Sequence, residues 1–188
     1  MAASIKGSAF QSVQTDVLRL VDQNAIDLDE VGRELTDKDR GCLDSFVTPV
    51  SWVPIATYGR CLELLARVEG GDDPVGYLRA RGREGAKRLL GGAYQGFARA
   101  SGGLDLKGVQ IVIGVARMLY DFMTWDARAL PNGCFEVTVR EAEAFPDTAL
   151  HSAEGFLEFY GELTSGARPR VASKRGSQGE ITILVTPG

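Results

Sequence analysis

The side chains that most often bind metals or act in catalysis are few in this sequence and widely spaced. There is one histidine, His151, and there are three cysteines, Cys42, Cys61 and Cys134. None of the cysteines belongs to a Cys-x-x-Cys pair, which argues against a local zinc site and against a secreted disulfide framework. We therefore expect the cysteines to be small buried side chains in a reducing compartment, and we expect no metal site.

His151 has two interpretations. A histidine can ligate a heme iron or sense pH near neutrality, but a single histidine without partner ligands is more often a surface or helix-capping residue, and we favour that interpretation. No Gly-x-Ser-x-Gly elbow or other nucleophile signature accompanies it. Because the sequence supplies no convergent acid, base and nucleophile, we expect no catalytic residue and a protein that is not an enzyme.

Two further patterns indicate ligand chemistry but have structural explanations. The glycines at 91–96 match only part of a phosphate-binding loop, because no Lys-Ser/Thr follows and no strand precedes them. A basic run consists of Arg79, Arg81, Arg83, Lys87 and Arg88. It could bind an anion, but Glu84 is available for helix ion pairs, so we interpret the run as a solvated helix face.

Length and composition are those of an ordinary globular domain. The chain has 188 residues, 44% hydrophobic and 24% charged, which is sufficient for one domain with a full core. Its net charge of −4 argues against a nucleic-acid partner. The N-terminus lacks the apolar region of a signal peptide, and the most apolar stretch, 109–119, is too short to span a bilayer. We expect a soluble, cytoplasmic protein.

Hydrophobic spacing predicts that the first two-thirds of the chain are helical. The expected helices cover about 10–21, 28–35, 37–46, 55–68, 72–100 and 104–120. Ser51 is expected to cap the fourth, with Pro54 in its first turn, and Val75 begins the inner stripe of the fifth. Glycines of the fifth helix, such as Gly82, predict a close crossing with another helix. The β-branched run at 109–113 also permits a strand, and its length favours helix.

After residue 120 the hydrophobic pattern changes to a period of two. Alternating residues at 123–129 and 135–139 flank Asn132-Gly133, a strong hairpin signal. A helix begins near Pro146, and a second hairpin spans 168–186. The sequence predicts one α+β domain over 1–188. Its helical part covers 1–120, and its sheet part, 121–188, is an antiparallel β-β-α-β-β unit with a packed helix.

Four short motifs resemble a superfamily of ligand-binding domains. They are Lys6-Gly7-Ser8-Ala9-Phe10, Ser51-Trp52-Val53-Pro54 with Tyr58, Arg81-Gly82-Arg83-Glu84-Gly85-Ala86, and His151-Ser152-Ala153-Glu154-Gly155-Phe156-Leu157. With the element order, they make the chain similar to the superfamily that joins heme-NO-binding domains and 4-vinyl-reductase-type ligand-binding domains. Within it, the chain most resembles a paralogous family abundant in myxobacteria.

The resemblance implies a fold whose helices and sheet enclose a pocket or a dimer surface, usually in signal transduction, and it transfers no reaction. On the same resemblance we expect Trp52, Tyr58 and Trp125 to line the pocket. The chain lacks the Tyr-x-Ser-x-Arg element with which heme-NO-binding domains hold the heme propionates, and no cysteine follows Cys134 to form a metal cluster. We therefore expect no cofactor.

These observations predict a non-enzymatic regulatory module of signal transduction that binds a small apolar molecule or a protein partner, as a homodimer. We expect neither nucleic acid nor a membrane as a partner. The alternatives are a heme-based gas sensor that uses His151 and an enzyme that acts on a small molecule.

Overall fold

The computed structural model describes residues 2–91 and 106–188. The first elements are β1 (Ser4–Lys6), α1 (Gly7–Asp22), α2 (Leu28–Glu34), α3 (Asp37–Asp44), β2 (Trp52–Pro54), α4 (Ile55–Glu69), α5 (Pro74–Gly91) and α7 (Leu106–Leu119). The helices lie where hydrophobic spacing predicts them, and the run at 109–113 is helical. The part of the fifth helix expected at 92–100 lies outside the described residues. Within the described ranges, no helix is long and apolar enough to cross a membrane.

The short strands β1 and β2, which the sequence does not predict, form a two-stranded antiparallel sheet. Ser4 pairs with Pro54, and Lys6 pairs with Trp52. Because the residues before α4 are extended, Pro54 occupies the N-cap position, and the expected cap at Ser51 is wrong. The hydroxyl of Ser51 instead accepts a hydrogen bond from the Thr48 amide at 3.1 Å.

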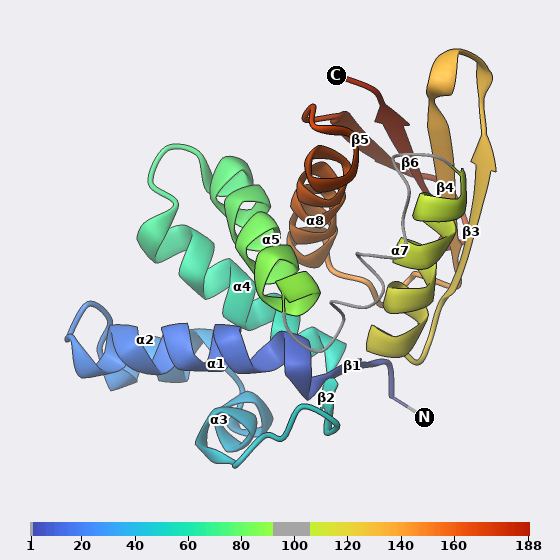
Figure 1. Ribbon diagram of the computed structural model, residues 1–188. Helices are drawn as coiled ribbons and strands as arrows, with labels where there is room; N and C mark the ends of the chain where they lie inside the picture. The colour runs from blue at the N-terminus through green and yellow to red at the C-terminus, as the bar shows by residue number, and fades with distance from the viewer. Residues whose placement is uncertain (1, 92–105) are drawn as a thin grey trace.

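The C-terminal part is a four-stranded antiparallel sheet with strand order β3-β4-β6-β5. The elements are β3 (Thr124–Ala129), a 3₁₀ turn (Pro131–Gly133), β4 (Phe135–Arg140), α8 (Asp147–Ser165), β5 (Arg170–Arg175) and β6 (Ile181–Thr186). The central strands β4 and β6 place Val137 opposite Ile183, and buried residues alternate along both. Figure 1 shows α7 and α8 on the same side of the sheet. The predicted α+β fold, with its β-β-α-β-β sheet part, is confirmed.

The two long helices α5 and α8 cross at glycines. A Cβ added to Gly82 of α5 would collide with the backbone carbonyl oxygen of Ser152 on α8. One added to Gly155 of α8 would collide with that of Arg79 on α5. Each glycine admits the backbone of the other helix, so the predicted close crossing is confirmed. Hydrophobic spacing predicts Val75 on the buried stripe of α5, but it is 40% exposed, because it lies in the first turn, before the crossing.

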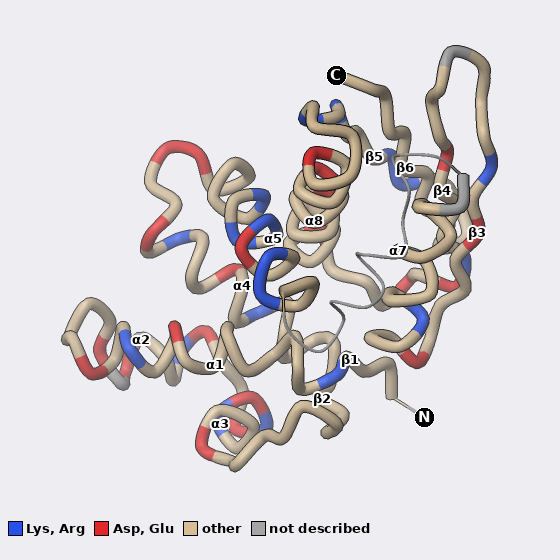
Figure 2. Tube along the Cα trace, in the orientation of Figure 1, with Lys and Arg blue, Asp and Glu red and all other residues tan. Residues whose placement is uncertain are grey.

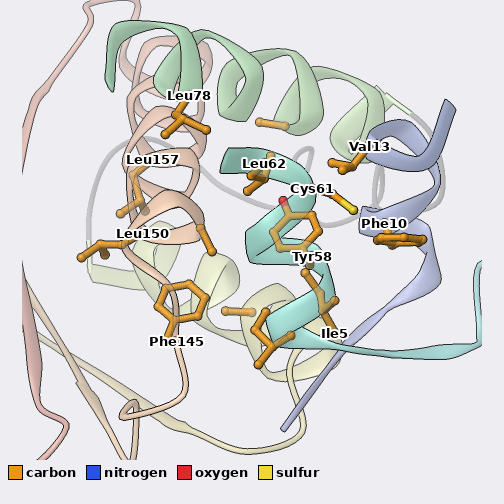
Figure 3. Packing of buried hydrophobic residues seen from close by; sticks show 14 of the residues in the cluster. Ile5, Phe10, Val13, Tyr58, Cys61, Leu62, Leu78, Phe145, Leu150 and Leu157 are labelled. Carbon is orange, nitrogen blue, oxygen red and sulfur yellow. The ribbon is translucent and has the colours of Figure 1, made fainter. Parts of the chain in front are cut away.

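The hydrophobic core extends from the helices into the sheet. Figure 3 shows Tyr58 of α4 in the centre of this packing, with Phe10 on one side and Leu157 on the other. Where α7 meets β3, Tyr120 stacks on Trp125 with ring centroids 6.0 Å apart. The junction between helices and sheet is therefore lined by aromatic and aliphatic side chains.

Candidate ligand-binding site

A cavity of about 310 Å³ lies at this junction. It is bordered by the helices α1, α4, α5, α7 and α8 and by the strands β3 and β4. Its volume is at the lower end of the range for small-molecule sites, roughly 300–1,000 Å³. Helix α7 supplies the largest apolar share of the wall, namely Val109, Val112, Ile113, Val115, Ala116 and Leu119. The cavity is therefore suited to a small, largely apolar molecule.

Polar groups in the wall are few, and several have no partner. Ser8 Oγ, Arg81 Nε and Trp125 Nε1 are buried and have no hydrogen-bond partner among the described residues. Among the described residues, four buried side-chain atoms are in this condition, and three of them belong to residues that line the cavity. A buried polar atom left unpaired costs about 1–3 kcal/mol. Unused hydrogen-bonding capacity is thus concentrated around the cavity.

Two arginines of α5 border the cavity, and they differ in their partners. Arg81 is held by Asp16 of α1, with Nη2 2.7 Å from the carboxylate, and its Nη1 donates to the Tyr77 hydroxyl at 3.2 Å. Arg88 is exposed and forms no ion pair with the described part of the chain. No described acidic residue lines the cavity. Among the described residues, none therefore neutralises the positive charge of Arg88 on the α5 side of the cavity.

The three aromatic residues expected in the pocket are divided by the structure. Tyr58 and Trp125 line the cavity and are 7% and 6% exposed. Trp52 lies outside it on β2, is 46% exposed, and has Lys6 Nζ 3.7 Å from its ring centroid. The sequence does not single out Ser8, because nothing in a helical pattern shows which polar residue will face a cavity.

The first half of the basic run does not form the expected solvated face. Arg79 contacts the buried carboxylates of Glu154 and Glu158 on α8, at 2.9 and 3.2 Å, and Arg83 contacts Glu162 at 2.6 Å. Figure 2 shows the basic positions of α5 beside the acidic positions of α8. The prediction of a solvated helix face is wrong for these arginines, because α8, an acidic helix far away in the sequence, covers this part of α5. The two C-terminal residues of the run are exposed as expected.

His151 lies on α8 next to cavity residue Ser152 but is not itself in the wall. Its Nδ1 is 2.9 Å from Glu154 Oε2, while Glu154 Oε1 accepts hydrogen bonds from the amide and hydroxyl of Ser173. Burial would raise the pKa of Glu154, but hydrogen bonds from Ser173 and His151 and the charge of Arg79 lower it below its ordinary value. Among the residues that the structure describes, no three His, Cys, Asp or Glu side chains form a group suited to a metal.

Comparison with known proteins yields solved structures only, since no protein-family model and no curated protein matches the chain. An H-NOX protein from S. oneidensis in the Fe(II)NO ligation state has a TM-score of 0.65 and 12% identity, over 98% of this chain and 99% of that one. The Fe(II) unliganded H-NOX protein from K. algicida has a TM-score of 0.64 and 9% identity, over 98% and 97%. A third structure, from work on modulating heme redox potential through protein-induced porphyrin distortion, has a TM-score of 0.58 and 14% identity, over 97% of this chain and 99% of that one.

The chain therefore has the fold of H-NOX domains over almost its whole length. The resemblance to heme-NO-binding domains is confirmed at the level of the fold, which is all that such low identities establish.

The described part of the cavity wall does not fit a heme iron. Protein ligands of heme iron are His, Cys, Met or Tyr. The described lining contains none of the first three, and its tyrosines are Tyr58 and Tyr120. Burial raises the pKa of both phenols, which disfavours the phenolate that would bind iron. Arg81 and Arg88 suit anionic groups, but the described wall offers iron no favourable ligand.

Proposed function

We propose that this protein is a sensor module with the H-NOX fold, which binds a small molecule in the cavity and catalyses no reaction. The observation that carries the proposal is the composition of the cavity wall. Extensive aliphatic surface surrounds a few polar atoms that lack partners, which is the usual composition of a binding site. A reaction would need an acid or base facing the cavity, and its described wall contains no carboxylate, histidine or cysteine.

A heme-based gas sensor is the second candidate, and the comparisons favour it over a module with an unspecified ligand. The similar structures include H-NOX proteins in the Fe(II) and Fe(II)NO states. A histidine whose Nδ1 faces a carboxylate, as His151 faces Glu154, is also typical of metal ligands. The position of His151 outside the cavity wall argues against this candidate.

Native mass spectrometry followed by hemin titration separates the two candidates. The native mass of freshly purified protein is compared with its denatured mass, and hemin binding is then followed by visible absorption in the wild type and in His151→Ala. A retained molecule other than heme, without a specific hemin spectrum, supports the sensor module. A stoichiometric hemin spectrum that responds to NO and disappears in His151→Ala supports the gas sensor. A protein that retains no molecule and binds neither hemin nor apolar probes contradicts both.

We also infer that the chain belongs with the myxobacterial paralogous family, on the four motifs that carry that resemblance. The proposed module is cytoplasmic, forms one domain over 1–188 and acts as a homodimer that contacts a protein partner. Sedimentation at several protein concentrations tests the dimer. A single cooperative unfolding transition tests the domain assignment.

A further inference from the structure

We propose that the cavity selects an amphipathic organic acid, with its acidic group beside Arg88 and its apolar body against α7. This inference rests on the proposed function, because it names the class of molecule that the sensor module binds. Three features of the cavity support it, namely its size, its charge and the donor character of its unpartnered polar atoms.

The size of the cavity limits the apolar body. Its volume is about 310 Å³, twice that of an engineered apolar cavity of roughly 150 Å³ that accommodates one benzene molecule. By that proportion the body contains roughly a dozen carbon atoms. The aliphatic side chains of α7 and Leu62 of α4 provide the surface against which such a body packs.

The charge of the cavity determines the head group. Arg88 lines the cavity and is also exposed, so it lies where the cavity meets solvent. It has no carboxylate partner in the described ranges, unlike Arg81, which Asp16 neutralises. An acidic group at this position pairs with Arg88 while the apolar body stays inside, and a cationic head group would be repelled.

The unpartnered atoms of the wall can all donate a hydrogen bond, which favours a ligand that carries acceptor atoms. Trp125 Nε1 and Arg81 Nε carry hydrogens and are donors only, and Ser8 Oγ can also donate. A ligand that satisfies them must offer acceptor oxygens, which a carboxylate has in excess over an alcohol or an amine. The described part of the wall offers iron no favourable ligand, and the proposed recognition of the acid uses no metal.

Tryptophan fluorescence provides a direct test, because the chain has two tryptophans and only Trp125 lines the cavity. In a Trp52→Phe background, all tryptophan emission comes from Trp125. Dodecanoate, dodecanol and dodecylamine share one apolar chain and differ in head group, so they are titrated separately at concentrations where each is monomeric. Arg88→Gln removes the proposed charge partner, and Lys87→Gln, an exposed neighbour on the same helix, is the matched control.

We expect dodecanoate to change the Trp125 emission saturably and to bind more tightly than dodecanol or dodecylamine. Arg88→Gln should weaken dodecanoate binding about tenfold, the effect of losing one charge-assisted hydrogen bond. It should leave dodecanol unchanged, and Lys87→Gln should leave all three unchanged.

Three results would overturn the inference in distinguishable ways. If dodecanol binds as tightly as dodecanoate, or if Arg88→Gln has no effect on dodecanoate, acid recognition is wrong although the cavity still binds small molecules. If no dodecyl probe binds but hemin does, the gas-sensor candidate replaces it. If neither hemin nor any dodecyl probe binds, the proposed function fails together with this inference.

Discussion

Replacing Asp39 with asparagine is expected to lower the free energy of unfolding by about 2–4 kcal/mol. Asp39 is fully buried, and its carboxylate accepts hydrogen bonds from Arg60 Nε and Nη2, both at 2.7 Å, and from the Thr57 hydroxyl at 2.5 Å. The Thr36 amide and hydroxyl donate to it as well. These bonds join α3 to α4 and complete the capping box of α3.

The magnitude follows from what the substitution leaves behind. Breaking a buried ion pair costs about 3–5 kcal/mol when the remaining charge stays buried. Arg60 is 36% exposed and can turn toward water, and an asparagine keeps one acceptor oxygen, so the expected loss lies at or just below the lower end of that range. For a chain of this length the expected fall in Tm is roughly 10 °C.

Urea unfolding of the wild type and Asp39→Asn measures this difference, with Asp37→Asn as the control. Asp37 lies in the same helix, is 93% exposed, and pairs with Arg40 on the surface. Its substitution should change the free energy of unfolding by no more than about 0.5 kcal/mol.

The pH dependence provides a second check on Asp39. Burial alone would raise its pKa, but the hydrogen bonds from Arg60, Thr57 and Thr36 outweigh burial and hold the pKa well below its ordinary value. The stabilisation is therefore fully present above the unfolded-state pKa, about 3.9, and is lost as the pH falls toward the folded-state pKa. The difference between wild type and Asp39→Asn should be constant at neutral pH and shrink below about pH 4. A difference under about 1 kcal/mol at neutral pH, or one that grows in acid, would refute the reasoning.

Two further predictions concern helix packing and thiol reactivity. Gly155→Ala should destabilise the protein by about 3 kcal/mol or more, because the added methyl meets the backbone of α5. The control Gly85→Ala, which has nothing within 4 Å of the added atom, should stabilise α5 by up to about 1 kcal/mol. Equal Tm shifts in the two variants would contradict the crossing. Burial raises the pKa of Cys61 to about 12. At pH 8, iodoacetamide should therefore modify Cys42 in the native protein and reach Cys61 only after unfolding. Mass spectrometry of labelled peptides measures both rates, and equal rates would be inconsistent with the burial of Cys61.

The helices and hairpins are predictable from the sequence because their signals are local. A period of 3.6 or 2 and a turn signal such as Asn132-Gly133 lie within a few residues of one another. The strands β1 and β2 have three residues each, too few for a period to emerge, and each finds its partner across three intervening helices. The wrong prediction of a cap at Ser51 has the same cause. The start of α4 depends on whether residues 52–54 are extended, and they are extended because they pair with β1.

The candidate site is less predictable than the fold. The family resemblance predicts Tyr58 and Trp125 in the pocket, and it also predicts Trp52, which lies outside the cavity. The basic run gives no local signal that separates Arg79, which pairs with a buried carboxylate on α8, from Arg88, which is exposed at the cavity. Which residue pairs and which stays free depends on α8, and a single helix pattern contains no information about its neighbour.

The crossing of α5 and α8 determines which side of the cavity can yield. Both helices border the cavity, and their backbones lie in close contact at Gly82 and Gly155. The opposite wall is α7, whose Arg117 donates to the Trp125 carbonyl oxygen at 2.7 Å. Trp125 belongs to β3, an edge strand of the sheet. Since close-packed interiors transmit strain instead of absorbing it, an entering molecule should displace α7, and the displacement should reach the outer edge of the sheet through β3. We therefore expect the α5–α8 side of the cavity to stay in place and α7 to move, which carries the movement to an edge strand of the sheet, a kind of surface at which other chains can pair.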